Sequence, residues 1–153
     1  MSDRRSFIKQ LTVAGVATGA TKAFFPGLSI SPVRAGITLA DKGRALYAVT
    51  VNRGASKHTL GAAKDLADYL SRITGGRFKI TTGDGTEGIA VGTYKEFSKL
   101  KLKDMFNSDD PIRLDEYLLR THSKGVYLIG ATGLAAQHAV WDFLHRIGYR
   151  QFF

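Results

Sequence analysis

The sequence has 153 residues and no cysteine, and it contains only three prolines and one tryptophan. The absence of cysteine excludes structural disulfides, thiolate zinc sites, iron–sulfur clusters and cysteine nucleophiles. Hydrophobic residues make up 44% of the chain and charged residues 23%, proportions that are ordinary for a globular protein and unlike those of a disordered one. We therefore expect one compact domain, the usual outcome at this length.

The first 35 residues differ from the rest and resemble a twin-arginine export signal of bacteria. Arg4 and Arg5 are adjacent, and they are followed by Phe7 and Lys9 at the spacing that this signal uses. We therefore expect the twin-arginine export machinery to be a partner of the chain. The expected location of the mature protein is periplasmic or secreted.

Two further features of this segment agree with export. Residues 10–21 are uncharged and only mildly apolar, too short and too polar for a stable membrane span, which needs about 20 apolar residues. Val33, Arg34 and Ala35 form the small-x-small pattern that signal peptidase reads, so we expect cleavage after Ala35. The alternative, an amphipathic helix that belongs to the domain, is disfavoured by glycines in this segment and by the lack of an apolar stripe with helical period.

Nearly half of the net positive charge belongs to this segment. The formal net charge of the whole sequence is +9, but removal of residues 1–35 leaves 17 basic and 12 acidic residues, a net charge of +5. The charge alone is therefore weak support for nucleic-acid binding, and we expect no nucleic-acid partner.

Residues 36–153 are expected to form the mature domain, a mixed β-sheet with helices packed on it, in the α/β or α+β class. The predicted order is β-α-β-β-α-β-β-α-β, from apolar periodicity and turn residues. The predicted elements are a strand at 45–51, a helix at 57–74, strands at 78–82 and 89–92, a short helix at 94–100, a hairpin of strands 116–121 and 125–129, a helix at 134–147 and a strand at 149–153.

The helix at 57–74 has the clearest pattern. One arc of its helical wheel is apolar, and the opposite arc carries charged residues. Gly75 and Gly76 are expected to end this helix. Thr93 and Glu96 have the spacing of a capping box at the start of the short helix. The apolar arc consists of Leu60, Ala63, Leu66, Ala67, Leu70 and Ile73.

Two motifs have the spacing of a binding site. His138, Asp142 and His145 follow one another at i, i+4 and i+7, which aligns three metal ligands on a helix, but this face lies opposite the apolar arc and is better explained as a solvated face. The turn Gly130–Gly133 precedes a helix and could hold a phosphate, but a plain turn with Thr132 near the cap explains it better. We therefore expect no metal and no cofactor.

The other polar groups also lack the arrangement that a catalytic site requires. A glycosidase needs two carboxylates in one cleft, about 5 Å apart in the retaining enzymes, and nothing in the sequence brings the acidic pairs together. The serine–histidine neighbours lack a nucleophile elbow. The lysine cluster could bind a polyanion, but Phe97 is the only aromatic residue that lies among the lysines. A solvated basic face explains the cluster better. These groups are Asp109 with Asp110, Asp115 with Glu116, Ser56 with His58, Ser123 with His122, and Lys95, Lys99, Lys101 and Lys103.

The order of four motifs resembles one group of known domains. Residues 62–75 have the pattern A-A-x-x-L-x-x-Y-L-x-x-I-T-G, and residues 89–93 have the pattern I-x-V-G-x. A hairpin follows at 116–131, and the chain closes with A-V-W-D-F-L, G-Y-R and the pair Phe152–Phe153. This succession resembles the N-terminal domain that precedes the catalytic barrel in α-glucuronidases, β-N-acetylhexosaminidases and related exported bacterial proteins.

The resemblance implies a mixed sheet with helices on one side and a non-catalytic role. In those families the catalytic carboxylates lie on the barrel, so no catalytic residue is carried over to this chain. We expect an accessory domain of an exported glycoside hydrolase that acts in polysaccharide degradation, with a truncated chain and the barrel as the missing partner. Phe152 and Phe153 would pack at the domain junction.

Two alternatives remain open. A free-standing carbohydrate-binding module would stack sugars on aromatic side chains. A small phosphate- or nucleotide-binding enzyme would use the turn Gly130–Gly133. The aromatic candidates for the first alternative are Tyr94, Tyr117, Tyr127 and Trp141.

Overall fold

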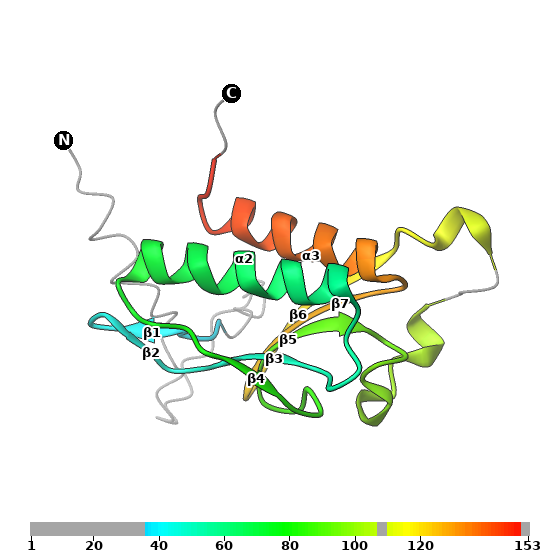
Figure 1. The fold of residues 1–153 in the computed structure, drawn as a ribbon, viewed down its shortest axis with the longest axis horizontal. Helices are drawn as coiled ribbons and strands as arrows, with labels where there is room; N and C mark the ends of the chain where they lie inside the picture. The colour runs from blue at the N-terminus through cyan, green and yellow to red at the C-terminus, as the bar shows by residue number, and fades with distance from the viewer. Residues whose placement is uncertain (1–35, 107–109, 151–153) are drawn as a thin grey trace, which may run out of the picture.

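The computed structural model describes residues 36–106 and 110–150, which form two layers (Figure 1). One layer is a five-stranded sheet. The other consists of two helices, α2 (Lys57–Thr74) and α3 (Gly133–Arg146), which lie side by side on one face of the sheet. The predicted class, a mixed sheet with helices packed on it, is confirmed.

Four of the five strands are parallel. The strand order is β4-β3-β5-β7-β6, and β6 at one edge runs antiparallel to β7. The antiparallel pair is the predicted hairpin, in which Tyr117 lies opposite Gly130 and His122 opposite Gly125. The strands are β3 (Val49–Val51), β4 (Ile80–Thr82), β5 (Gly88–Thr93), β6 (Tyr117–His122) and β7 (Gly125–Gly130).

The strand predicted at 45–51 is two separate strands. β1 (Ala40–Asp41) and β2 (Arg44–Ala45) form a small antiparallel hairpin, and the chain enters the main sheet only at Val49. The turn of this hairpin has left-handed backbone at both central residues, Lys42 (φ 46°) and Gly43 (φ 78°). Two positive φ angles in succession match the twist of a two-residue hairpin turn. The sequence lacked the usual Asn-Gly signal, so the hairpin was not predicted.

The main core lies between the sheet and the helices. Alternate residues of the parallel strands, such as Val49, Ile89 and Leu128, are completely buried there. They pack against Leu66 and other apolar residues of α2 and α3. The predicted apolar arc of α2 is largely correct, with two exceptions. Ile73 is only partly buried and lies outside the core cluster. Leu60 is 47% exposed, and the buried residue of that turn is Thr59.

A second cluster covers part of the other face of the sheet, and it replaces the predicted helix at 94–100. Thr93 and Glu96 form the predicted capping box, but Phe97 leaves the helical path (φ −110°, ψ 55°). Its ring is buried, and a Cβ on Gly85 or Gly92 would lie 2.8 Å from it. Burial of this ring therefore limits the helix to single 3₁₀ turns. These turns are η1 (Ser98–Leu100), η2 (Lys103–Met105) and, farther along the chain, η3 (Pro111–Arg113).

The last helix agrees with its prediction within one residue at each end. It is followed by Gly148, whose left-handed backbone (φ 102°) suits glycine. A strand was predicted at 149–153, but Tyr149 and Arg150 are not in a strand. Residues 151–153, and with them Phe152 and Phe153, lie outside the described residues, as does the whole of the predicted signal, Arg4, Arg5, Phe7, Lys9 and Ala35 included.

Candidate functional site

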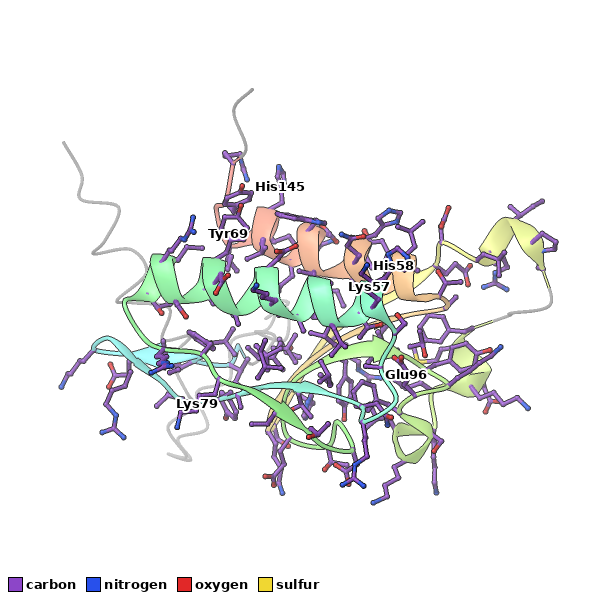
Figure 2. All side chains as sticks on the ribbon, viewed as in Figure 1. Lys57, His58, Tyr69, Lys79, Glu96 and His145 are labelled. Carbon is purple, nitrogen blue, oxygen red and sulfur yellow. The ribbon has the colours of Figure 1, made fainter. Side chains whose placement is uncertain are left out.

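The carboxyl edge of the parallel strands is the usual ligand site in α/β sheets, at the point where the strand order reverses. In this chain that point lies between β3 and β5. Figure 2 shows Glu96 there, below Lys57 and His58 at the start of α2. The Glu96 carboxylate accepts hydrogen bonds from the backbone N–H groups of Thr93 (2.6 Å) and Ser56 (3.2 Å). The Glu96 side chain thus lies at the edge of the sheet where other α/β sheets bind their ligands.

Neighbouring polar groups at this edge are bonded within the protein as well. Asn52 donates its side-chain N–H to the carbonyl of Glu96 (2.6 Å). Ser56 is the N-cap of α2, and its hydroxyl accepts from the N–H of Thr59 (3.2 Å). A Cβ on Gly133 would lie 2.8 Å from that hydroxyl, so the starts of α2 and α3 are in direct contact. The arrangement stabilises the helix ends, because these polar groups bond to one another.

The turn Gly130–Gly133 is the plain helix start that the sequence favoured. Thr132 is the N-cap of α3, and its hydroxyl accepts from the N–H of Ala135 (3.1 Å) while its carbonyl accepts from the N–H of Ala136 (2.9 Å). A Cβ on Gly130 would lie 2.2 Å from the nitrogen of Ala136. The amide of Ala135 is therefore capped by the Thr132 side chain, and that of Ala136 makes the first bond within the helix.

The predicted polar face of α3 is solvated. His138 and His145 are exposed, and Asp142 binds Arg146 (2.9 Å) and accepts from the hydroxyl of Tyr117 (3.2 Å). The Arg146 guanidinium, which donates to Asp142, holds the pKa of that carboxyl below its ordinary value. Within the described residues no three His, Cys, Asp or Glu side chains are grouped so that they could hold a metal ion.

Several of the remaining polar candidates have local structural partners. Asp110 caps η3, Glu116 pairs with Arg113, and the backbone N–H of Lys124 donates to Nδ1 of His122 (3.3 Å). Asp109 lies outside the described residues. In the lysine cluster, Lys99 pairs with Asp84 (3.1 Å), Lys95 lies over the ring of Tyr94 and Phe97 is buried, so the cluster offers no ring for stacking.

The aromatic candidates differ in their accessibility. Tyr94 is only 6% exposed and stacks on Phe106, which removes it from any sugar-binding surface. Tyr127 is covered on one side by His122, whose ring centroid lies 4.1 Å away. Trp141 is half-buried on α3 and belongs to an aromatic group that the sequence did not reveal.

This group, which we call the junction surface, consists of Tyr69, Trp141 and Tyr149. The centroids of the Tyr69 and Trp141 rings are 5.7 Å apart, and those of Tyr69 and Tyr149 are 4.5 Å apart. All three rings are half-buried and pack against the main core. Figure 2 shows Tyr69 on α2 and His145 on α3 at the same end of the helix pair, near the point where the described chain ends.

Polar contacts fix the geometry of the junction surface. Tyr149 donates its hydroxyl to that of Tyr69 (3.2 Å), and loss of this bond on ionisation raises the pKa of Tyr149. The Arg72 guanidinium lies 5.6 Å from the centroid of the Tyr69 ring, a cation–π contact. Arg150 donates to the carbonyl of His145 (2.8 Å), which holds the chain against the end of α3. The surface is thus a fixed arrangement of rings.

Comparison with known proteins adds no relative. Neither a scan against protein-family models nor a search of curated proteins found a match to this chain. The resemblance to glycoside-hydrolase accessory domains therefore rests on the sequence motifs and remains a prediction. In the described part of the chain, neither helix is long and apolar enough to cross a membrane.

Proposed function

We propose that this chain is the non-catalytic N-terminal accessory domain of an exported, α-glucuronidase-like glycoside hydrolase. In this proposal the domain packs against a catalytic barrel encoded after Phe153, and the barrel supplies the chemistry. The twin-arginine motif around Arg4 and Arg5 and the order of the sequence motifs support export and family.

The junction surface is the structural observation that carries the proposal. Three half-buried aromatic rings, one from α2, one from α3 and one from the segment after α3, lie together. Aromatic side chains are enriched in the buried centres of interfaces, because each buries a large apolar area with few rotatable bonds. The surface therefore suits contact with another domain.

The polar groups of the described residues agree with a structural role. Glu96 serves a capping network, Asp142 binds Arg146, and the Asp110 side chain caps a 3₁₀ turn. None of these carboxylates is paired with a second carboxylate across a cleft. The arrangement provides stability, and the catalytic pair is expected on the barrel.

The first test is the coding sequence downstream of the Phe153 codon. An open frame that continues into a barrel supports the proposal, and a stop codon with no barrel nearby contradicts it. The second test is association of this chain with the separately expressed barrel, measured by calorimetry. Trp141→Ala should weaken association at least tenfold, whereas Leu134→Ala, a change at a 48% exposed site on the same helix, should leave it unchanged. Circular dichroism would confirm that both variants fold.

The junction surface also favours one alternative, a free-standing carbohydrate-binding module. Trp141 is the only tryptophan of the chain, so its fluorescence reports directly on this surface. Titration with xylan and chitin oligosaccharides should leave the fluorescence unchanged if the surface binds a barrel. A saturable change that Trp141→Phe alters and Leu134→Ala does not would favour the carbohydrate-binding module instead.

A further inference from the structure

A second surface lies on the strand layer, and we call it the hairpin surface. It is built from the β1–β2 hairpin and the segment before and within β4, which lie against each other. A Cβ on Gly76 would lie 2.7 Å from the nitrogen of Ala45, and Val49 donates its backbone N–H to the carbonyl of Lys79 (2.9 Å). The residues of the hairpin surface are Lys42, Arg44, Leu46, Arg77, Lys79 and Ile80, all exposed.

Four of these six residues are cations, and the exposed Asp41 lies directly opposite Arg44 in the hairpin, so the net charge of this region is +3. No ion pair or hydrogen bond joins the side chains of Lys42, Arg44, Arg77 and Lys79 to another residue in the described ranges. The ion pairs in those ranges use other cations, and Lys124 neutralises Glu87 in the concavity that Leu46 lines (2.7 Å). The four positive charges are therefore available to an external anion.

The backbone of the hairpin presents one of these charges at its tip. Lys42 has a left-handed φ of 46°, a conformation in which Asn, Asp and Gly are the usual residues. Figure 2 shows Lys79 just before β4, on the side of the sheet remote from the helices and at the same end of the molecule as the hairpin. The cations thus come from two neighbouring segments at one end of the strand layer.

Two large apolar side chains lie near the cations. Leu46 is 50% exposed, and Ile80 is 43% exposed. Ile80 pairs with the core residue Val49 and therefore lies on the helix-facing side of β4, at the residue where this strand begins. Leu46 also lines an open concavity of about 460 Å³ together with Tyr47, Thr81 and others. Exposed aliphatic side chains gain nothing from a purely polar polyanion, but they gain free energy at the boundary between lipid headgroups and acyl chains.

We propose that the hairpin surface binds anionic lipid headgroups at the surface of a bilayer. The cations are attracted to the negative surface, and Leu46 and Ile80 enter the headgroup region. The contact is peripheral, since no described helix spans a membrane. This binding is independent of the accessory role, because it involves this chain alone and none of the rings of the junction surface.

The test is co-sedimentation of the full 153-residue chain with vesicles of phosphatidylcholine, with and without phosphatidylglycerol. We expect binding only to the vesicles that contain phosphatidylglycerol, and weaker binding at higher salt. R44Q/K79Q should lower the partition coefficient about 30-fold, since each cation near an anionic surface contributes about a fivefold factor. The control K57Q/K64Q removes the same charge from exposed sites on α2 and should have little effect. A parallel series that carries R4Q/R5Q in every protein removes the contribution of the N-terminal arginines.

A second pair of measurements separates lipid from other polyanions. L46Q/I80T should weaken vesicle binding severalfold but leave binding to a short DNA duplex at low salt unchanged, because only the bilayer accepts apolar side chains. Unchanged melting temperatures would show that the variants fold. The proposal is overturned by absence of binding to phosphatidylglycerol vesicles, by equal binding to phosphatidylcholine alone, by equal losses in R44Q/K79Q and K57Q/K64Q, or by an apolar variant that binds vesicles as tightly as the original chain.

Discussion

Removal of the Glu96 side chain should destabilise the domain far more than removal of the exposed carboxylate of Glu87. The Glu96 carboxylate accepts from the N–H of Thr93 at 2.6 Å and from the N–H of Ser56 at 3.2 Å. The first bond closes the capping box after β5, and the second joins that turn to the start of α2. Glu96→Ala therefore breaks a local bond and a tertiary bond together.

The size of the effect follows from the environment of the two donors. Hydrogen bonds to a charged group contribute about 1.5–3 kcal/mol each, and the Thr93 amide is partly buried, so it should lose an amount in that range. The Ser56 amide is exposed, and water replaces much of its bond. The sum is about 2–4 kcal/mol, which corresponds to a fall in melting temperature of about 10 °C for a domain of this size.

Thermal and urea unfolding, followed by circular dichroism, measure this effect. The matched control is Glu87→Ala, which removes an ion pair with Lys124 whose side chains are 69% and 64% exposed, and which should cost about 0.5 kcal/mol or less. Glu96→Gln keeps one acceptor oxygen and should lie between the two. Equal melting temperatures for Glu96→Ala and Glu87→Ala would refute the argument that this carboxylate joins β5 to α2.

Three further outcomes can be measured. Gly125→Ala should prevent stable folding, because its Cβ would lie 1.8 Å from the carbonyl oxygen of Gly88, and the soluble yield with circular dichroism checks this. Leu66→Ala should lower the free energy of unfolding by about 2–5 kcal/mol, since Leu66 is completely buried, and urea titration measures it. Hydrogen bonds from the side chain and backbone of Thr86 lower the pKa of Asp84 to about 2 from its ordinary 3.8, so its stabilising effect should be present above pH 4 and lost as the pH falls through about 2. NMR titration should show this pKa, and Thr86→Ala should raise it.

The elements with strong local signals were predicted well from the sequence. Residues 57–74 combine an apolar arc with a glycine stop, and the helix has these bounds in the structure. The hairpin of β6 and β7 and the helix α3 were also predicted to within a residue or two, because turns and glycines bound each of them. In these segments the local preference and the tertiary structure agree.

The errors came from contacts that the periodicity of one segment does not reveal. Phe97 has a place in a helical pattern, but burial of its ring beside Gly85 and Gly92 breaks the helix that the capping box begins. The run 45–51 has strand character throughout, yet Ala45 pairs with Ala40, and Val49 pairs with Ile80 and Ile89. Pattern alone cannot assign one apolar run to two sheets.

The candidate surfaces were hidden for the same reason. Tyr69 and Tyr149 are 80 residues apart, and their hydroxyl contact depends on the packing of α2 beside α3. Arg44 belongs to the small hairpin, and Lys79 belongs to the segment before β4. These two segments lie against each other only in the folded chain. A sequence signal existed for Trp141, which was named among the aromatic candidates, but not for its two neighbours.

The junction surface and the hairpin surface share no residue, and they lie on different layers of the molecule (Figure 1). Tyr69, Trp141 and Tyr149 belong to the helix layer and its C-terminal extension, whereas Arg44 and Lys79 belong to the strand layer. Both surfaces lie at the same end of the molecule (Figure 2), and we expect a barrel bound to the helix layer to leave the cations of the strand layer accessible. The longer protein should bind phosphatidylglycerol vesicles as tightly as this chain does, and R44Q/K79Q should weaken both to the same degree. If the barrel abolished vesicle binding, the two surfaces would have to overlap, and the separation of the two roles would be wrong.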